Sequence, residues 1–499
     1  MTTPPHHRES RSEIPPRDAE SCDVAVIGGG ISGLVAGFRL ARAGAGVQVL
    51  ESSDRIGGAI HSLSREEGLL ELGPFSVMVR SPEFRDLLDE LDLKPVTIDA
   101  GRSRKRYIQL NGDLRLLPGS VPGLLGSNLL SLRGRFDLLR SVISNRMRGE
   151  AIPSNLHEFG TRRFGAEFAN HVVGPGTMGI FGAEARELET EACLPEVHRT
   201  DGISRTTIGL VRSLRKTAAS GPPRRLMSLE GGLSSLTDRL ASQLAGSVRT
   251  ATRVTRIIRR VSGFEIHHSG GRPLQAGSVI LTTGPEATAE LVADMHPQAS
   301  EVIRQIKAAG LGVVHLIFDE EQVGRQLDGF GYLVPEIEPD MNPVLGVIWP
   351  GSVFPGQATK GRTIIRVMVG GTRWPDALNL DDQTLVHRCL DRIRSIHRIE
   401  GEPRSVEVTR WPASVPVYEP GHADRIRSIE DSVSKIPGLR LAGSWICPPR
   451  GGVGVNDRVR HACEVAADLL DHHHTCWSED ISASAPHPPP DITRGRNSA

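Results

Sequence analysis

The sequence predicts an α/β fold in which a discontinuous Rossmann-type domain is interleaved with an α+β domain and a helical region. Residues 23–50 carry the pattern of a strand, a glycine-rich turn, a helix and a second strand. Patterns that would complete the same domain return at residues 229–283 and 439–470. The length of 499 residues exceeds what one hydrophobic core usually serves, so two or three domains are expected.

The first segment is one βαβ unit. An apolar strand from Val24 to Ile27 leads into a glycine turn, an apolar helical stretch continues to Ala43, and a second strand spans residues 47–50. Because the turn follows a buried strand and opens a helix, its backbone N–H groups would face a pyrophosphate. The turn satisfies G-x-G-x-x-G with Gly28, Gly29, Gly30, Ile31, Ser32 and Gly33.

Glu51 ends the second strand of this unit. A carboxylate at that position accepts hydrogen bonds from the ribose hydroxyls of a dinucleotide, and it would repel a 2′-phosphate. The pattern therefore predicts a dinucleotide other than NADP, held in part by Glu51 and the adjacent Ser52.

Composition limits the functional classes. A hydrophobic fraction of 38%, a charged fraction of 24% and zero net charge are typical of soluble globular proteins, and no nucleic-acid partner is expected. The 6 cysteines form no C-x-x-C pair, so we expect neither a disulfide framework nor a metal site, and a reducing, cytoplasmic location fits best. Residues 1–21 lack the apolar core of a signal peptide, and no apolar run is long enough to span a bilayer.

The remaining pattern places the other elements. Helical patterns lie around residues 82–93 and 135–147. Further along, Gly231 and Gly232 precede an amphipathic helix, which is followed by a strand around Val254, a hairpin and a strand at 279–282. A strand at 439–442, a Gly/Pro-rich loop at 443–454 and a helix at 455–470 follow. We divide the chain into a disordered arm (1–21), three cofactor-binding parts (22–95, 227–285, 436–471), a helical, membrane-facing and substrate region (96–226), a substrate-binding domain (286–435) and a disordered tail (472–499).

Residues 116–132 are uncharged, rich in Leu and broken by Pro118 and Pro122. Two interpretations stand side by side: an apolar surface that rests on the inner face of the cytoplasmic membrane, and an interdomain core segment.

A second glycine motif distinguishes the cofactor. The run Asp54-Arg55-Ile56-Gly57-Gly58-Ala59-Ile60 resembles a motif of the flavoprotein superfamily that includes amine oxidases, phytoene desaturases and protoporphyrinogen oxidases. The resemblance implies that Arg55 reaches toward the diphosphate of FAD, and that Gly57 and Gly58 let the backbone approach it. Glu71-Leu72-Gly73-Pro74 matches the family's E-x-G-P, which implies that Gly73, Pro74 and Phe75 lead to the isoalloxazine edge.

Two later segments resemble the same superfamily. The strand through Val254 is similar to the part that presents backbone groups to the adenine. The C-terminal segments resemble the closing FAD motif, which implies that a helix N-terminus points at the flavin and stabilises its anionic reduced form. The residues assigned to that motif are Gly443, Val453, Gly454 and Val455.

Four stretches resemble protoporphyrinogen oxidases in particular. They are residues 105–118, residues 179–195, residues 329–356 and residues 410–422. The second stretch begins at Gly179, and the fourth begins at Arg410-Trp411. The resemblance implies that Arg106 pairs with a propionate of the substrate and that Trp411 contacts FAD. An apolar disc needs an apolar slot, which Phe330, Leu333 and Met368 could line. Met368 stands where relatives often place an aromatic residue, and Asp457-Arg458 replaces a smaller helix start.

The resemblance implies FAD-dependent oxidation of protoporphyrinogen IX to protoporphyrin IX. A hydride would pass from a meso carbon to flavin N5, and dioxygen would reoxidise the flavin to give hydrogen peroxide. No acid or base is encoded in the matching segments, so we name no catalytic residue. Coproporphyrinogen III oxidation, a flavin amine oxidase, a carotenoid desaturase and a non-catalytic FAD-bound scaffold are the alternatives, and a homodimer and a peripheral membrane contact stay open.

Overall fold

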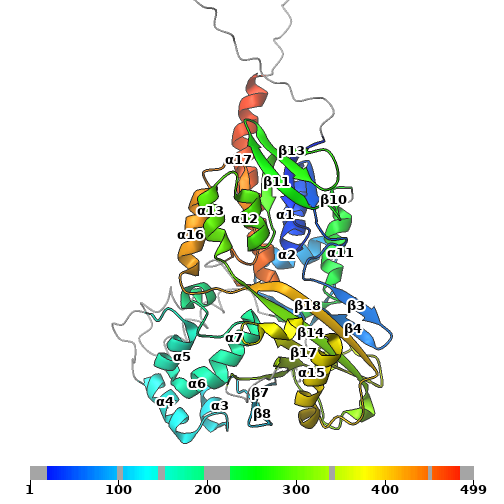
Figure 1. Cartoon of the computed structure of the whole chain (residues 1–499), viewed down its shortest axis with the longest axis vertical. Coiled ribbons are helices and arrows are strands. Elements are labelled where there is room, and N and C mark those ends of the chain that lie inside the picture. The colour runs from blue at the N-terminus through cyan, green and yellow to red at the C-terminus, as the bar shows by residue number, and fades with distance from the viewer. Residues whose placement is uncertain are drawn as a thin grey trace, which may run out of the picture.

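The computed structural model describes residues 20–97, 105–143, 152–195, 225–244, 246–336, 343–447 and 452–483. Figure 1 shows two large sheets, each with its own helices, one in the upper and one in the lower half of the view. The predicted α/β fold with a discontinuous Rossmann-type sheet is confirmed.

The first sheet joins strands from three distant parts of the chain. Its order is β10-β2-β1-β13-β12-β11, with β19 paired to β13. The pairs β10·β2, β2·β1, β1·β13 and β13·β19 are parallel, whereas β11 and β12 form an antiparallel hairpin beside β13. The strands are β1 (Ser21–Ile27), β2 (Val47–Leu50), β10 (Val248–Arg249), β11 (Val254–Arg260), β12 (Gly263–His268), β13 (Leu274–Leu281) and β19 (Leu439–Leu441).

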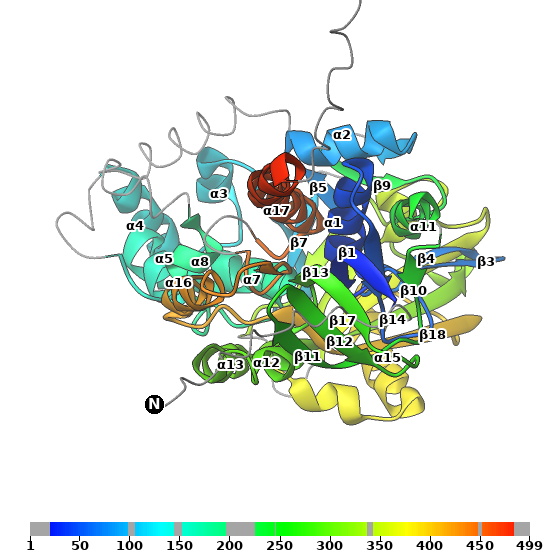
Figure 2. The ribbon, with the colours of Figure 1, turned by 90° about the horizontal axis from the view of Figure 1, so that it is seen from above.

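Helices cover both faces of this sheet (Figure 2). One apolar core contains residues of β1 and β2 together with α1 (Ile31–Arg42), α2 (Pro82–Glu90), α11 (Ser234–Gln243) and α17 (Val455–Ala483). The other core lies beneath α12 (Pro285–Val292), α13 (Pro297–Arg304) and α16 (His422–Val433). Because β1 alternates between the two cores, Val24 and Val26 on one and Ala25 and Ile27 on the other, the strand is buried on both faces, as parallel sheets are.

The second sheet has the order β18-β14-β17-β16-β15-β7-β8. One face packs on α15 (Asp382–His397), and the other face contacts the segment that follows β4 (Gly68–Glu71). Its strands are β7 (Arg106–Leu110), β8 (Asp113–Leu116), β14 (Ala308–Asp319), β15 (Gly331–Leu333), β16 (Val344–Ile348), β17 (Arg362–Gly370) and β18 (Ser405–Pro416).

Smaller elements complete the described chain. Two small sheets are β3 (Ser62–Arg65) with β4 (Gly68–Glu71), and β5 (Val77–Val79) and β6 (Pro95–Thr97) on either side of β9 (Arg225–Leu229). Further helices are α3 (Val121–Gly126), α4 (Leu132–Ile143), α5 (Leu156–Phe164), α6 (Ala166–Phe168), α7 (Gly174–Phe181) and α8 (Thr190–Cys193). No helix among the described residues is both long and apolar enough to cross a bilayer.

Two expectations about elements need comment. The last helix was expected to end near residue 470, but α17 continues to Ala483 because no Gly or Pro occurs between Val455 and that residue. The Leu-rich segment 116–132 divides: Leu129 and Leu130 are buried with Ile108 and Leu138, whereas its two end residues are exposed. Its leucines at positions 124, 129 and 130 are therefore core, while other residues of the segment are exposed.

Candidate flavin site

The glycine turn at the start of α1 is shaped as the phosphate-binding motif requires. Gly28 has a φ of +112°, and a Cβ on Gly33 would lie 1.9 Å from the carbonyl oxygen of Gly28. No side chain caps the N-terminus of α1, and its first turn holds no acidic residue. The N–H groups of Ile31 and Ser32 therefore stand at an open, electropositive helix end that fits an anionic group.

Glu51 lies beside this turn. Its Oε2 accepts a hydrogen bond from the Gly29 N–H at 2.6 Å, and its Oε1 accepts from the N–H of Ser53 at 2.8 Å. Ser52 makes one long contact to the same carboxylate, at 3.4 Å. The backbone oxygen of Glu51 also accepts from the N–H of Thr252, two residues before Val254. The chain thus brings the predicted ribose and adenine segments together.

The second glycine motif packs directly on the first. The N–H of Gly57 donates to the carbonyl of Gly29 at 2.8 Å, and a Cβ on Gly58 would lie 3.2 Å from the Cα of Gly30. The guanidinium of Arg55 donates to the carbonyls of Ile56 and Gly58, at 3.1 and 2.6 Å, and lies 5.6 Å from the centre of the Trp411 ring. The reach of Arg55 toward a diphosphate stays a prediction.

The closing segment contributes the N-terminus of α17. Asn456 accepts hydrogen bonds through Oδ1 from the N–H groups of Arg80 and Ser81, at 3.0 and 3.1 Å. Asp457, whose side chain is 5% exposed, pairs with Arg80 at 2.5 Å. This ion pair gives Asp457 a structural role at the helix start, because it fixes the first turn of α17 to the segment that follows β5.

The other predicted residues of this motif surround the same helix start. Val455 is the first residue of α17 and packs in the core of α1. Val453 packs against the neighbouring cluster that contains Phe181 and Tyr418. Gly443 follows β19 with a φ of +150° and lies near Thr282, whose hydroxyl donates to the carbonyl of Gly28 at 3.0 Å. The closing motif and the glycine turn are therefore neighbours across the end of the first sheet.

The five predicted substrate residues also gather. Arg106, Leu333 and Met368 come from β7, β15 and β17 of one sheet, and Leu333 and Met368 both pair with Gly346 of β16. A Cβ on Gly179 of α7 would lie 2.8 Å from Leu333 Cδ2. Phe330 and Met368 pack against the cluster that contains Phe75.

An aromatic contact joins this wall to the flavin motif. The rings of Phe330 and Phe75 meet edge to face with centroids 5.7 Å apart. The guanidinium of Arg106 lies 4.9 Å from the centre of the Phe330 ring. The residues predicted to bind substrate and the segment after Gly73 are therefore in direct contact.

Arg106 is the charged group of this wall. It makes no ion pair with any described residue, while its neighbour Lys105 is paired with Asp328 at 2.5 Å. Partial burial lowers the pKa of the guanidinium from its usual value, but an arginine stays charged at neutral pH. An unpaired cation over an aromatic ring is suited to a carboxylate of a ligand.

Two residues of the site were missed. Arg366 of β17 donates to the carbonyls of Glu71 and Gly73, and Gly346 makes room for Leu333 and Met368. The signal for Arg366 was a charge in the otherwise apolar run Thr363-Ile364-Ile365-Arg366-Val367. Such a charge within a buried strand indicates a specific partner.

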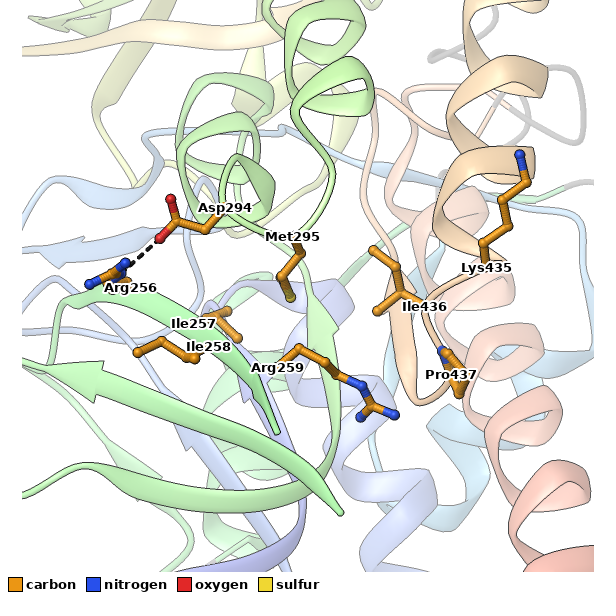
Figure 3. Close-up of a pocket in the computed structure, with 9 residues that line it drawn as sticks. All are labelled: Arg256, Ile257, Ile258, Arg259, Asp294, Met295, Lys435, Ile436 and Pro437. Atoms are coloured by element: carbon orange, nitrogen blue, oxygen red, sulfur yellow. Dashed lines mark hydrogen bonds and ion pairs between the residues drawn. The ribbon is translucent and has the colours of Figure 1, made fainter. Parts of the chain in front are cut away.

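A separate cavity of about 490 Å³ lies elsewhere on the first domain (Figure 3). Its wall combines β11 with the loops that precede α13 and follow α16, and Arg256 is paired there with Asp294 at 2.7 Å. None of the predicted site residues lines it. The cavity is therefore distinct from the site built on Gly28, Glu51 and Gly73.

Comparison with known proteins agrees with this geometry. Residues 31–470 match the profile of the family described as flavin containing amine oxidoreductase. The coproporphyrinogen III oxidases of Propionibacterium freudenreichii and Bacillus subtilis are 28% and 26% identical to the chain. The first match covers 94% of each sequence, and the second covers 90% of this chain and 97% of the relative.

A solved structure from Exiguobacterium, named as a candidate protoporphyrinogen oxidase, superposes with a TM-score of 0.76 at 23% identity and covers 91% of this chain and 99% of its own. That likeness shows the fold. The open end of α1, the carboxylate of Glu51 and the interlocked glycine turns fit FAD as the cofactor. The chain belongs to the family of flavin-containing amine oxidoreductases.

Proposed function

We propose that this protein oxidises a porphyrinogen to a porphyrin in haem biosynthesis, with FAD as its cofactor and dioxygen as the electron acceptor. The names of the relatives support the substrate class. The observation that carries the proposal is the guanidinium of Arg106, which lies over Phe330 beside an apolar wall and makes no ion pair with a described residue. An apolar macrocycle with carboxylates on its edge needs both features.

Each part of the wall has a task. Arg106 binds a propionate and so sets which edge of the macrocycle faces inward. Leu333 and Met368 contact the apolar ring and exclude water, and Gly179 leaves room for the side chain of Leu333. When bound, the flavin supplies the hydride acceptor, and dioxygen takes up the electrons as hydrogen peroxide.

The identity of the porphyrinogen is a separate point. We propose coproporphyrinogen III as the first candidate, because the two relatives described above carry that name. Protoporphyrinogen IX is the second candidate, supported by the four sequence stretches and by the name of the Exiguobacterium structure. The two substrates differ in that vinyl groups replace two of the propionates.

The test uses the purified protein with its bound FAD. Each porphyrinogen is supplied in air, and porphyrin fluorescence and hydrogen peroxide are followed together. We expect fluorescence to rise with both substrates and three peroxides to form per porphyrin, because six electrons leave the ring. Bound FAD without turnover of either porphyrinogen would refute the proposed function.

A peripheral membrane contact is also proposed, on an exposed apolar stripe of α4. Leu132, Phe136 and Leu139 are 81%, 65% and 43% exposed, and their spacing places them on one face of the helix. The same helix carries three Arg and one Asp, so it suits an anionic membrane surface.

Flotation with anionic vesicles tests this contact. Phe136→Ser is expected to release the protein from vesicles, because it removes the central apolar side chain of the stripe. Val261→Ser is the control, since Val261 is a fully solvent-exposed apolar residue that lies alone on the β11–β12 turn. Equal flotation of both variants and the wild type would show that α4 is not the contact.

A further inference from the structure

A buried cation lies behind the segment assigned to the isoalloxazine edge. Arg366 is in the middle of β17 and is 3% exposed. Its Nε donates to the carbonyl of Glu71 at 3.2 Å, and its Nη2 donates to the carbonyl of Gly73 at 2.6 Å. Its Cζ lies 5.8 Å from the centre of the Phe75 ring. One side chain of the second sheet thus contacts the whole segment from Glu71 to Phe75.

Trp411 also binds the segment from Glu71 to Phe75. Its Nε1 donates to the carbonyl of Leu72 at 2.8 Å, so side chains of β17 and β18 bind three successive carbonyls. The segment is fixed on another side by the second glycine motif, because a Cβ on Gly73 would lie 1.7 Å from the carbonyl oxygen of Ala59. The segment therefore has little freedom to shift while Arg366 and Trp411 stay in place.

The charge of Arg366 has no acidic partner at ion-pair distance in the part of the chain that the structure describes. The carboxylate of Glu71 accepts instead from the N–H of Leu233 at 2.8 Å and from the hydroxyl of Ser62 at 2.7 Å. His315 is paired with Arg366 across β14 and β17, and its two ring nitrogens bind no described residue. Burial and the charge of Arg366 hold the pKa of His315 well below its usual range, so it adds no charge.

The charge of Glu71 acts on Arg366, but no described carboxylate lies at ion-pair distance from it. A buried guanidinium without an ion pair is costly, and a further anion in the site would offset that cost. The segment that it binds leads to the expected flavin edge, where negative charge develops when the cofactor is reduced. Opposite charges attract strongly where water is excluded. Arg366 therefore does two things: it binds the carbonyls of Glu71 and Gly73, and it places a fixed positive charge behind that segment.

We propose that Arg366 is a positioning residue for the flavin, which holds the segment from Glu71 to Phe75 against the isoalloxazine edge and places a permanent positive charge beside it. The inference rests on the cofactor placement that the proposed function uses. It extends that function because Arg366 and Met368 lie on the same face of β17, so one strand orders both the cofactor and the substrate wall.

Three variants separate the mechanical from the electrostatic part. Arg366→Met removes both, and Arg366→Lys keeps the charge but loses the fork that binds two carbonyls. Trp411→Phe removes the donor to Leu72 and keeps an aromatic ring beside Arg55. The control is Arg362→Met on the same strand, whose guanidinium pairs with Asp319 at the partly exposed strand end. The readouts are the dissociation constant for FAD, the circular dichroism of the bound flavin and its midpoint potential in a dithionite titration.

We expect Arg366→Lys and Trp411→Phe to alter the flavin circular dichroism and to weaken FAD binding, by about tenfold for the lysine variant, while the potential stays near the wild-type value. Arg366→Met should in addition shift the potential downward, and Arg362→Met should match the wild type. If Arg366→Met does not fold, the other two variants still decide: wild-type dichroism and affinity in both would overturn the inference. An unchanged potential in a folded Arg366→Met would overturn its electrostatic part.

These readouts need no porphyrinogen. A wild-type protein that binds FAD but oxidises neither porphyrinogen refutes the proposed function, and the role of Arg366 is then still decided by the flavin measurements alone.

Discussion

At the scale of single residues, the glycine turn is the most constrained position. A Cβ on Gly33 would meet the carbonyl oxygen of Gly28 at 1.9 Å, and backbone cannot yield as a flexible side chain can. Gly33→Ala is expected to lower the free energy of unfolding by about 2 to 3 kcal/mol and to abolish FAD retention. Melting temperature and FAD content measure both.

The control for that substitution is Gly284→Ala. Gly284 also stands between a strand of the first sheet and a helix, but its φ is −62° and no atom lies within 4 Å of an added Cβ. It should keep full FAD content. A Gly33→Ala protein that is as yellow and as stable as this control would contradict the account of the turn.

Arg106 is expected to act in substrate binding. Arg106→Met should raise KM for the porphyrinogen by about ten- to a hundredfold and change kcat little, because a charged hydrogen bond to a propionate is lost in ground and transition states alike. Lys105→Met is the matched control, since the Lys105 ammonium is already paired with Asp328. Equal KM values for the two variants would show that Arg106 is not the propionate partner.

Glu71 predicts a pH dependence. Burial raises its pKa to about 7 even though Leu233, Ser62 and Arg366 favour the charged form. The pKa of the Glu71 carboxyl is 4.5 in the unfolded chain and about 7 in the folded protein. Between these two pH values the folded protein holds a proton on Glu71 that the unfolded chain has lost, so stability falls as pH rises through this range. The loss amounts to about 3 kcal/mol at most. In Glu71→Gln the melting temperature should depend less on pH in this range than it does in the wild type. An unchanged pH dependence would show that Glu71 is not the group responsible.

At the scale of elements, the start of α17 is fixed to the segment that follows β5 by the ion pair between Asp457 and Arg80. Asp457 and Asp468 both pair with an arginine at 2.5 Å, yet their side chains are 5% and 51% exposed. Asp457→Asn is therefore expected to cost about 1 to 2 kcal/mol and to alter the flavin spectrum, whereas Asp468→Asn should have little effect on either. Denaturant unfolding and absorbance spectra distinguish them, and equal effects would show that the helix start is not specially fixed.

The elements that the sequence predicts well are those with local signals. The unit β1-α1-β2 follows from an apolar strand, a glycine turn and a helical period, and its bounds agree within a few residues. The role of Arg366 could not be predicted in this way, because its partners Glu71 and Gly73 lie almost three hundred residues earlier in the chain. The pairing of β7 with β15, which brings Arg106 to Leu333, is equally non-local.

At the scale of the whole molecule, one segment links the second sheet to the glycine motifs and α11 of the Rossmann-type part. The first sheet carries the glycine turn and Glu51, and the second carries Arg106, Met368 and Arg366. The segment from Glu71 to Phe75 contacts the second sheet through Arg366, and it also contacts Leu233 at the start of α11 and Ala59 of the second glycine motif. The sequence resemblance could suggest each part separately, whereas their contact through Phe75 and Phe330 is visible only in the folded chain.

The most direct measurement is to mix the FAD-bound protein with a porphyrinogen in the absence of air while recording flavin absorbance. The account predicts that the oxidised flavin band bleaches, and that it returns with porphyrin fluorescence when air is admitted. A flavin band that stays unchanged with both coproporphyrinogen III and protoporphyrinogen IX would contradict it.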